Sequence, residues 1–406
     1  MRVLFATTAG AGHFGPIVPV AQACVAAGWD VAVAAPASFA ESVERAGLTC
    51  RPFGEPSGEA LGRVFGRLRT LPRVEGDAVV MADVFGRLDA QAALPGLTAL
   101  MQEWRPDLVL REPCEFGSVA AAAAAGVAQA QVGIGMARLG GSFLDVVRDP
   151  LSELEDLVGL DRGRAAALVV ETSTVTAVPA ALDTSDADFV VEPRADADRP
   201  GPALRYRTST AAAPRLPTSW GDPDLPLVYV SFGSVAAGLR HLGPVFRATL
   251  DAVADLPVRV LLTTGTGADP AGLGPIPDNV QVEAWWPQAE AMSFCSLVVG
   301  HGGFGTTMAA LAYGVPQIVV PLFASDQYVH AERVEAVGAG LRLVGGVGAL
   351  PQLADLVPRM LADPAYEAGA RVVADEMASL PELESLLPDL VELSRTSSPA
   401  AEAQVR

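Results

Sequence analysis

A histidine lies in a glycine-rich turn near the start of the chain. The turn is Gly10-Ala-Gly-His-Phe-Gly15, between an apolar segment expected to be a strand and a segment expected to be a helix. The amino end of a helix disfavours a charged imidazolium, so His13 is expected to be neutral. A neutral imidazole can remove a proton from a hydroxyl group near pH 7. His13 is therefore a candidate general base; the alternative is a loop histidine that only bonds to the backbone.

The same glycines fit the G-x-G-x-x-G pattern of dinucleotide-binding loops. Such sites place an Asp or Glu at the end of the second strand, where it binds the ribose. Here the second predicted strand, Asp30–Ala35, is followed by Pro36 and no acid. A nicotinamide or flavin site would thus lack a necessary partner. Glu112 instead follows the predicted strand Leu108–Arg111, at the same sheet edge as His13, and is a candidate acidic partner for the base.

A second glycine-rich loop lies in the C-terminal half. The segment His301-Gly-Gly-Phe-Gly-Thr-Thr307 follows the predicted strand Leu297–Gly300 and begins a predicted helix. Glycines let the backbone approach a ligand, and a helix N-terminus offers free N–H groups to an anion. The loop is therefore a candidate diphosphate site that needs no metal. A plain glycine-rich turn is the alternative, but it would not explain the His, the two Thr and the helix start together.

Short apolar strands alternate with helical stretches in both halves of the chain. This βαβ alternation predicts an α/β fold with two Rossmann-like, doubly wound parallel-sheet domains, whose strand ends would face each other across a cleft. The predicted strands are Val3–Ala6, Val31–Ala35, Leu48–Pro52, Leu108–Arg111 and Ala128–Gly133, then Leu227–Phe232, Arg259–Thr264, Val280–Ala284, Leu297–Gly300, Gln317–Pro321 and Gly340–Val344.

Composition sets the expected boundaries: an N-terminal domain over 1–200, a Pro- and Asp-rich linker over 201–226, a C-terminal domain over 227–385 and a final helix end and tail over 386–406. Two stretches after strands, Phe53–Glu75 and Met136–Asp161, are expected to be irregular and to lie near a ligand. Their apolar residues suit a hydrophobic ligand, but equally suit helix packing or a homodimer contact.

The charge balance limits the partners of the protein. A net charge of −19 over 406 residues argues against nucleic acid and against an anionic membrane surface. Four scattered cysteines suggest a reducing, cytoplasmic setting, and no segment is apolar enough to predict a membrane span. Two D-x-D matches, Asp186-Ala-Asp188 and Asp196-Ala-Asp198, lie in an Asp-rich stretch and are interpreted as solvated chance matches, so no metal site is expected.

At this point the chain resembles a known family. The motifs W-x-P-Q (285–288), H-G-G-x-G-T-T (301–307) and P-x-x-x-x-D-Q (321–327) are similar to the nucleotide-sugar motif of glycosyltransferases with the glycosyltransferase-B fold. Gly12-His-Phe-Gly-Pro16 and Val228–Ser234 match as well. The chain looks most like the actinomycete enzymes that attach deoxysugars to antibiotics such as macrolides, enediynes and aromatic polyketides.

The resemblance implies a role for each motif. In the N-terminal domain, which would bind a hydrophobic aglycone, His13 would activate the acceptor and Glu112 would be its acidic partner. In the C-terminal domain, the nucleobase would stack on Trp285 with Gln288 near the nucleoside, although Trp285 or Trp286 could also be core. The remaining implied contacts are Ser234, His301, Gly302, Gly303, Gly305, Thr306 and Thr307 to the diphosphate, and Asp326 and Gln327 to sugar hydroxyls.

The chain departs from the family pattern at two points. One extra residue lies between Pro321 and Asp326, which affects the aim of the D-Q pair. Relatives that use UDP-sugars place a ribose-binding Glu where this chain has Met308–Ala310. Because a deoxyribose lacks the 2′-hydroxyl, this favours dTDP over UDP.

The resulting hypothesis is an inverting hexosyltransferase that uses a dTDP-sugar as co-substrate, with no cofactor and no metal. Two alternatives stay open. One is a sugar-nucleotide epimerase of the same fold. The other is a non-catalytic subunit that binds dTDP and stabilises a partner transferase.

Overall fold

The computed structural model describes residues 1–406 except 69, 137–140, 184–200, 211–212, 218–219, 235, 239–241, 266–269 and 397–406. Both D-x-D matches lie outside the described residues. The chain divides into two compact units. Unit 1 comprises 1–177, 184–206 and 381–406, and unit 2 comprises 178–183 and 207–380.

Unit 1 contains a seven-stranded sheet with the order β3-β2-β1-β4-β5-β6-β7. All its strand pairs are parallel, as the βαβ alternation predicted. The strands are β1 Arg2–Ala6, β2 Asp30–Pro36, β3 Cys50–Phe53, β4 Leu108–Arg111, β5 Ala128–Val132, β6 Thr174–Thr176 and β7 Ala203–Arg205. The helices are α1 Ala11–Phe14, α2 Ile17–Ala26, η1 Ala37–Phe39, α3 Ala40–Arg45, α4 Gly58–Leu68, α5 Arg73–Val79, η2 Val80–Asp89, α6 Ala90–Glu103, α7 Gly117–Ala124, α8 Gly141–Val158, α9 Arg164–Glu171, η8 Leu383–Leu386 and α16 Leu387–Thr396.

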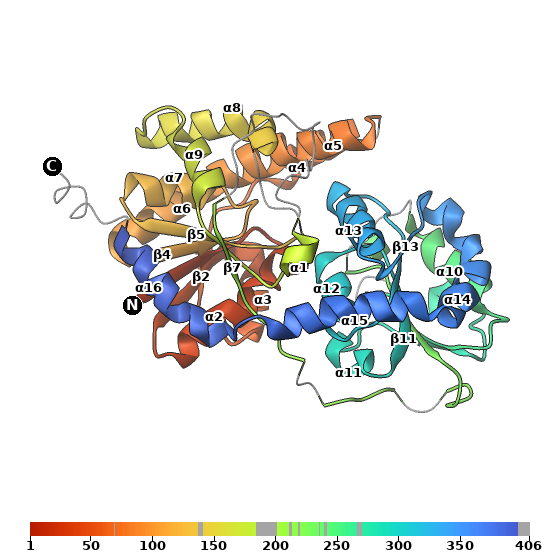
Figure 1. The fold of residues 1–406 in the computed structure, drawn as a ribbon. Helices are drawn as coiled ribbons and strands as arrows, with labels where there is room; N and C mark the ends of the chain where they lie inside the picture. The colour runs from red at the N-terminus through yellow and green to blue at the C-terminus, as the bar shows by residue number, and fades with distance from the viewer. Residues whose placement is uncertain are drawn as a thin grey trace. The chain divides into compact units, whose positions relative to one another are not determined.

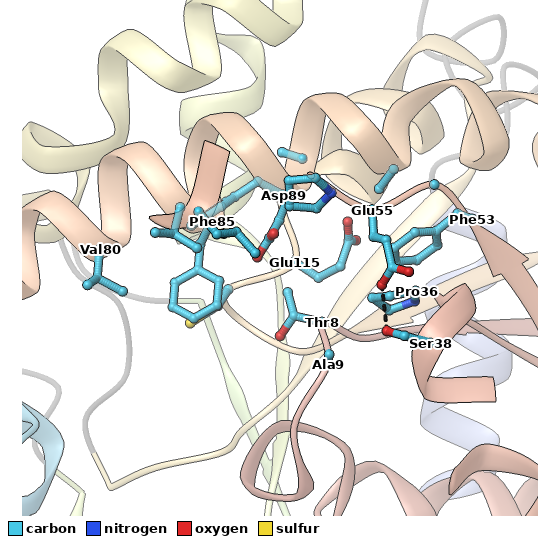
Figure 2. Close-up of a pocket in the computed structure, with 18 of the residues that line it drawn as sticks. Thr8, Ala9, Pro36, Ser38, Phe53, Glu55, Val80, Phe85, Asp89 and Glu115 are labelled. Carbon is cyan, nitrogen blue, oxygen red and sulfur yellow. Dashed lines mark hydrogen bonds between the residues drawn. The ribbon is translucent and has the colours of Figure 1, made fainter. Parts of the chain in front are cut away.

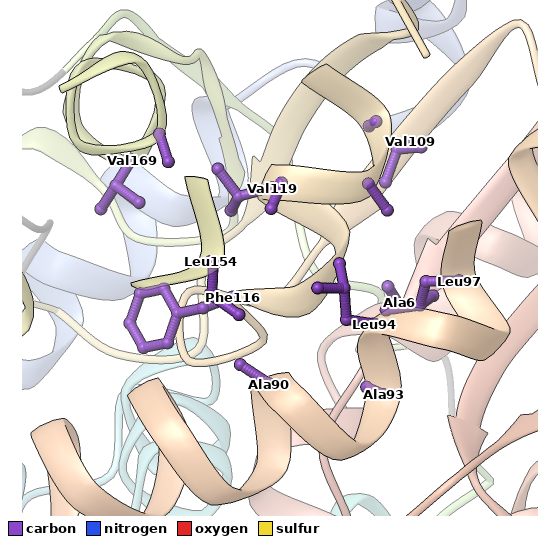
Figure 3. Close-up of a cluster of buried hydrophobic side chains, with 14 of the residues drawn as sticks. Ala6, Ala90, Ala93, Leu94, Leu97, Val109, Phe116, Val119, Leu154 and Val169 are labelled. Atoms are coloured by element: carbon purple, nitrogen blue, oxygen red, sulfur yellow. The ribbon is translucent and has the colours of Figure 1, made fainter. Parts of the chain in front are cut away.

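The alternation of side chains along β1 builds the core of unit 1 on both faces of the sheet. Leu4 and Ala6 pack on one face with residues of α6, α7, α8 and α9. Figure 1 shows these helices, and Figure 3 shows Ala6 among side chains from them. Val3 and Phe5 pack on the opposite face with residues of α2 and of α16, the helix that returns from the end of the chain. The sheet is thereby buried between two helical layers.

Unit 2 contains a six-stranded sheet with the order β10-β9-β8-β11-β12-β13, whose pairs are again all parallel. The strands are β8 Leu227–Ser231, β9 Arg259–Thr263, β10 Val280–Glu283, β11 Cys295–Gly300, β12 Gln317–Val319 and β13 Gly340–Arg342. The helices are η3 Ala180–Leu182, η4 Ala236–Gly238, α10 Pro244–Val253, η6 Pro270–Leu273, α11 Gln288–Met292, α12 Phe304–Ala312, α13 Ser325–Ala336, η7 Gly346–Gln352, α14 Leu353–Ala362 and α15 Pro364–Ser379. Residues of α10 and α14 cover one face, and residues of α11 and α12 cover the other.

Each sheet has a point at which the strand order reverses. This point lies between β1 and β4 in unit 1 and between β8 and β11 in unit 2. There, the loops that follow the two neighbouring strands run to opposite faces of the sheet. A binding crevice forms between them at the carboxyl edge. His13 and Glu112 follow β1 and β4, while Ser234 and His301 follow β8 and β11. The candidate residues therefore lie where this fold binds ligands.

Three expectations differ from the structure. The strands β6 and β7 were not predicted, and β7 lies within 201–226, the range expected to be a linker. The stretches expected to be irregular are largely helical, because they contain α4, part of α5 and the whole of α8. No helix among the described residues is both long and apolar enough to cross a membrane.

Candidate active site and nucleotide-sugar site

His13 and Glu112 contact each other at the carboxyl edge of unit 1. His13 belongs to the single turn of α1, where Gly10, at φ 142°, lets the chain leave β1 and start the helix at once. Nδ1 of His13 lies 3.2 Å from Oε1 of Glu112. The His13 side chain is 24% exposed, whereas that of Glu112 is fully buried. A buried carboxylate thus contacts one ring nitrogen, and the rest of the imidazole is partly exposed to solvent.

Glu112 is held by several hydrogen-bond donors. Oε1 accepts from the backbone N–H of Thr8 at 3.2 Å and from its hydroxyl at 2.9 Å, and Oε2 accepts from Cys114 N–H at 2.6 Å. Burial would raise the pKa of Glu112, but His13 and these donors outweigh it and keep the pKa below its usual range. Glu112 therefore stays ionised and can orient His13.

A cavity of about 350 Å³ lies beside this pair in unit 1. Figure 2 shows its lining, which comes from the loops after β1, β2, β3 and β4 and from α4, η2 and α6. The cavity is lined mostly by apolar side chains and is large enough to hold a small ring system. The lining residues are Thr8, Ala9, Pro36, Ser38, Phe53, Gly54, Glu55, Pro56, Leu61, Phe65, Val80, Val84, Phe85, Asp89, Ala90, Ala93, Cys114, Glu115 and Phe116.

The cavity and the base pair share residues. Thr8 and Cys114, which bond to Glu112, also line the cavity. The Phe85 ring, another part of the lining, lies 5.4 Å from the His13 ring between centroids. A molecule bound in the cavity would therefore lie near the imidazole.

His13, Glu112 and Cys114 together offer ligand atoms within 4.8 Å of one another. Within the part of the chain that the structure describes, this is the one such group that could hold a metal ion. The sequence predicted no metal site, so metal dependence has to be measured.

In unit 2, the loop that begins at His301 has the features of an anion site. His301 is buried between glycines: a Cβ on Gly233 would lie 2.7 Å from Cε1 of the ring, and a Cβ on Gly303 would lie 2.4 Å away. Burial lowers the pKa of His301 to about 4, although Asp326 and a hydrogen bond to the Ser231 backbone act to raise it. The ring is therefore neutral at pH 7.

The rest of this loop leads directly into α12. Gly303 is its N-cap and Thr306 and Thr307 lie in its first turn, so the N–H groups at the start of α12 have no intrahelical partner. Gly302 takes a φ of 87°, which a residue with a side chain rarely adopts. Ser234, an exposed residue of the loop after β8, follows Gly233. The loop therefore has free N–H groups of the kind that bind anions at a helix start.

The two tryptophans before α11 have different environments. Trp285 is 65% exposed. Trp286 donates its indole N–H to the carbonyl of Arg215, 3.3 Å away, and packs against the core of unit 2. Trp285 is therefore the one available for stacking. Gln288 donates to the hydroxyl of Thr306 at 2.7 Å, which joins this segment to the anion loop.

The two residues of the D-Q pair differ in accessibility. Asp326 lies in the first turn of α13 and is close enough to His301 to affect its pKa. Gln327 is buried, and its side-chain oxygen accepts from the N–H groups of Leu322 and Phe323 at 2.8 and 3.1 Å. Gln327 therefore shapes the turn after β12.

Two residues near these sites were not singled out in the sequence. His330, buried on α13, lies with Nδ1 2.6 Å from the carbonyl oxygen of Gly302, to which it donates a hydrogen bond. Asp89, at the end of η2, lines the cavity of unit 1. Neither belongs to a local motif, and only the fold brings each to its site.

Comparison with known proteins identifies the family. Residues 73–204 match the N-terminal domain and residues 247–393 the C-terminal domain of the erythromycin biosynthesis protein CIII-like family. The chain is 33% identical to an L-demethylnoviosyl transferase of Streptomyces niveus, over 98% of this chain and 100% of that protein. It is 28% identical to a 3-alpha-mycarosylerythronolide B desosaminyl transferase of Saccharopolyspora erythraea, over 94% and 95%.

Solved structures agree with these relatives. The glycosyltransferase VinC, whose structure is a complex with dTDP, is 25% identical, has a TM-score of 0.75, and aligns over 97% of this chain and 99% of its own. SnogD from Streptomyces nogalater is 26% identical, with a TM-score of 0.73 and the same coverage. The chain belongs to the erythromycin biosynthesis protein CIII-like family: it is an antibiotic glycosyltransferase with the glycosyltransferase-B fold.

Proposed function

We propose that this glycosyltransferase moves a deoxysugar, with inversion, from a dTDP-sugar to a hydroxyl group of a hydrophobic aglycone in antibiotic biosynthesis in the cytoplasm. The contact between His13 and the buried Glu112 is the observation that carries this proposal. The names of the relatives, which are sugar transferases, and the dTDP in the VinC structure support the substrate class.

The acceptor would be activated by His13. Glu112 is ionised and can only accept, so it fixes the N–H of the ring at Nδ1 and leaves the Nε2 lone pair free. Nε2 takes the proton of the acceptor hydroxyl while that oxygen attacks the anomeric carbon of the sugar. The bond from the anomeric carbon to the diphosphate breaks on the opposite face, which inverts the configuration.

The donor would be bound by unit 2. Trp285 stacks on the base, Gln288 lies near the nucleoside, and Ser234, His301 and the amides of 302–307 bind the diphosphate. Fixed donors at the diphosphate are most effective as negative charge develops on the leaving group. Asp326 binds sugar hydroxyls, and Gln327 holds the turn that presents them.

The two alternative functions are less well supported. An epimerase needs no base for an acceptor, and a non-catalytic subunit needs neither His13 nor Glu112 in place. Incubation with a dTDP-sugar alone separates an epimerase, which converts it, from a transferase, which hydrolyses it only slowly. Turnover of an acceptor by the purified protein without a partner would exclude the non-catalytic subunit.

Calorimetric binding of dTDP and UDP tests the donor site. Ala309, partly exposed on the first turns of α12, offers no acceptor to a ribose 2′-hydroxyl. Leaving that hydroxyl unpaired costs about 1–3 kcal/mol, or roughly tenfold or more in affinity. We expect dTDP to bind at least tenfold more tightly than UDP, with EDTA causing no change. Ala309→Glu should reduce the difference in affinity between dTDP and UDP.

Equal or reversed affinity would refute the deoxyribose argument. A strict requirement for a divalent metal would refute the metal-free anion loop, and loss of turnover with EDTA at unchanged dTDP affinity would point to the group formed by His13, Glu112 and Cys114.

A further inference from the structure

Asp89 is the unpaired carboxylate of the cavity in unit 1. Three carboxylic side chains line this cavity, and Figure 2 shows them turned into it: Glu55, Asp89 and Glu115. Glu55 accepts from the hydroxyl of Ser38 at 2.5 Å, and Glu115 accepts from the N–H of Ser118 at 3.0 Å. Among the described residues, Asp89 has no hydrogen-bond or ion-pair partner.

The cavity around Asp89 is lined mostly by apolar and acidic side chains. Val80, Val84 and Phe85 come from the same η2 segment as Asp89 and line the same cavity. Burial raises the pKa of Asp89 to about 6, as do the charges of Glu112 and Glu55, against the lowering effect of His13. Asp89 is thus ionised at pH 7.5 and close to the catalytic pair, and it has no basic residue to neutralise it in the lining.

A ligand that fills the cavity would remove water from this carboxylate. If the ligand offered only carbon or an ether oxygen at that point, Asp89 would be left partly buried and unpaired, which is unfavourable. A hydroxyl group would replace the lost water with a charge-assisted hydrogen bond. A ligand carboxylate would be repelled by the acidic lining.

Resting on the proposed function, we propose that Asp89 determines acceptor specificity: it accepts a hydrogen bond from a second hydroxyl group on the acceptor. The substrate class is therefore an apolar ring system with at least two hydroxyl groups, one that receives the sugar and one that bonds to Asp89.

Calorimetry with matched phenols tests this proposal. The probes are the 1,3-, 1,5-, 1,6- and 2,7-dihydroxynaphthalenes and their monomethyl ethers, added to the full chain saturated with dTDP at pH 7.5. We expect at least one diol to bind at least tenfold more tightly than its ethers. Asp89→Leu, which keeps the size of the side chain, should bring diol and ether within about twofold by weakening the diol.

Two further variants separate a specific bond from altered packing. Asp89→Asn keeps an acceptor oxygen and should retain part of the preference for the diol. Val84→Ala enlarges the same cavity and should weaken diol and ether alike, so their ratio is kept. Thermal unfolding checks that each variant is folded.

The proposal is overturned if the wild-type protein binds neither probe, binds diol and ether equally, or keeps its preference in Asp89→Leu. Failure of the proposed function is distinguishable, because it would appear as loss of dTDP binding in the same experiment. Normal dTDP binding without selectivity for the diol would overturn this inference alone.

Discussion

At the scale of single residues, the proposed base depends on one buried carboxylate. Glu112 collects donors from Thr8 and Cys114 besides His13, and this set of bonds keeps it ionised despite burial. In the proposed mechanism the charge has two uses: it would fix the tautomer of His13, and it would stabilise the imidazolium that forms when the acceptor proton is taken.

Glu112→Gln should reduce turnover about a hundredfold. The amide removes the charge and can turn its NH₂ group towards donors that need an acceptor. Asp107→Asn is the matched control, because Asp107 precedes β4 at its other end, where its carboxylate accepts from Arg2 N–H at 2.7 Å. Steady-state kinetics should show normal turnover in the control, and near-normal turnover in Glu112→Gln would remove Glu112 from the mechanism.

The protonation state of His301 has to change if its ring is to bind a diphosphate. The backbone of Ser231 favours the charged form of the His301 ring, and the neutral ring carries a single N–H. The other nitrogen then has a lone pair, which repels a diphosphate oxygen. The charged or titratable groups that act on the ring are Asp326 and His330. The pKa of the free protein's His301 is about 4, and a bound diphosphate raises it.

We therefore expect uptake of close to one proton when a dTDP-sugar binds between pH 5 and 6. The sign follows from the pKa: the free ring is neutral above about pH 4, the complex favours the imidazolium, and affinity falls as pH rises. Calorimetry in two buffers of different ionisation enthalpy measures the uptake. A dTDP-sugar is used because, unlike dTDP, it has no terminal phosphate to titrate in this range. Uptake that is unchanged in His301→Gln would contradict this account.

At the scale of elements, the loop between β11 and α12 is fixed by close packing on His301. A Cβ at Gly303 would lie 2.4 Å from both Cε1 and Nε2 of the ring, so either the loop or the ring must move. His330 on α13 holds the same loop through the Gly302 carbonyl. The anion site is thus assembled by β11, α12 and α13 together.

Gly303→Ala should weaken dTDP binding at least tenfold by calorimetry. Gly348→Ala is the control, because a Cβ there meets nothing within 4 Å in the same unit. If Gly303→Ala bound dTDP normally, the ring of His301 would not be part of the diphosphate site.

The sequence was sufficient to predict most of these elements. The predicted strands of both sheets are present, and most of them are apolar runs buried on both faces of their sheet. β6 and β7 were missed since each has only three residues and Thr174–Thr176 is polar at both ends. α4 was missed since Gly58, Gly62 and Gly66 disfavour a helix, and α8 contains Pro150. Tertiary packing overrode these local preferences.

The candidate sites were predictable only where a motif is local. The glycine-rich loops, His13 and Glu112 follow strands directly, so their positions came from strand order alone. Asp89 and His330 lie in helical segments without a motif, and only the fold shows which site each of them lies beside. Which tryptophan faces solvent also required the structure, because Trp285 and Trp286 are adjacent.

At the scale of the whole molecule, the chain does not divide at one linker. Unit 1 includes the last helix, α16, and unit 2 includes residues 178–183. Each unit is therefore built from segments that are separate in the sequence. The features proposed for the acceptor lie in unit 1 and those proposed for the donor lie in unit 2. Transfer therefore has to be measured on the full chain, with both substrates present.

The most direct test of the central claim is sugar transfer by the wild-type chain and by His13→Ala. A panel of dTDP-sugars is incubated with polyketide aglycones, products are identified by mass spectrometry, and dTDP affinity is measured on the same samples. The account predicts a glycoside with the wild-type protein alone, turnover lower by roughly a hundredfold or more in His13→Ala, and unchanged dTDP affinity. Near-normal transfer by His13→Ala, or conversion of the dTDP-sugar without an acceptor, would contradict it.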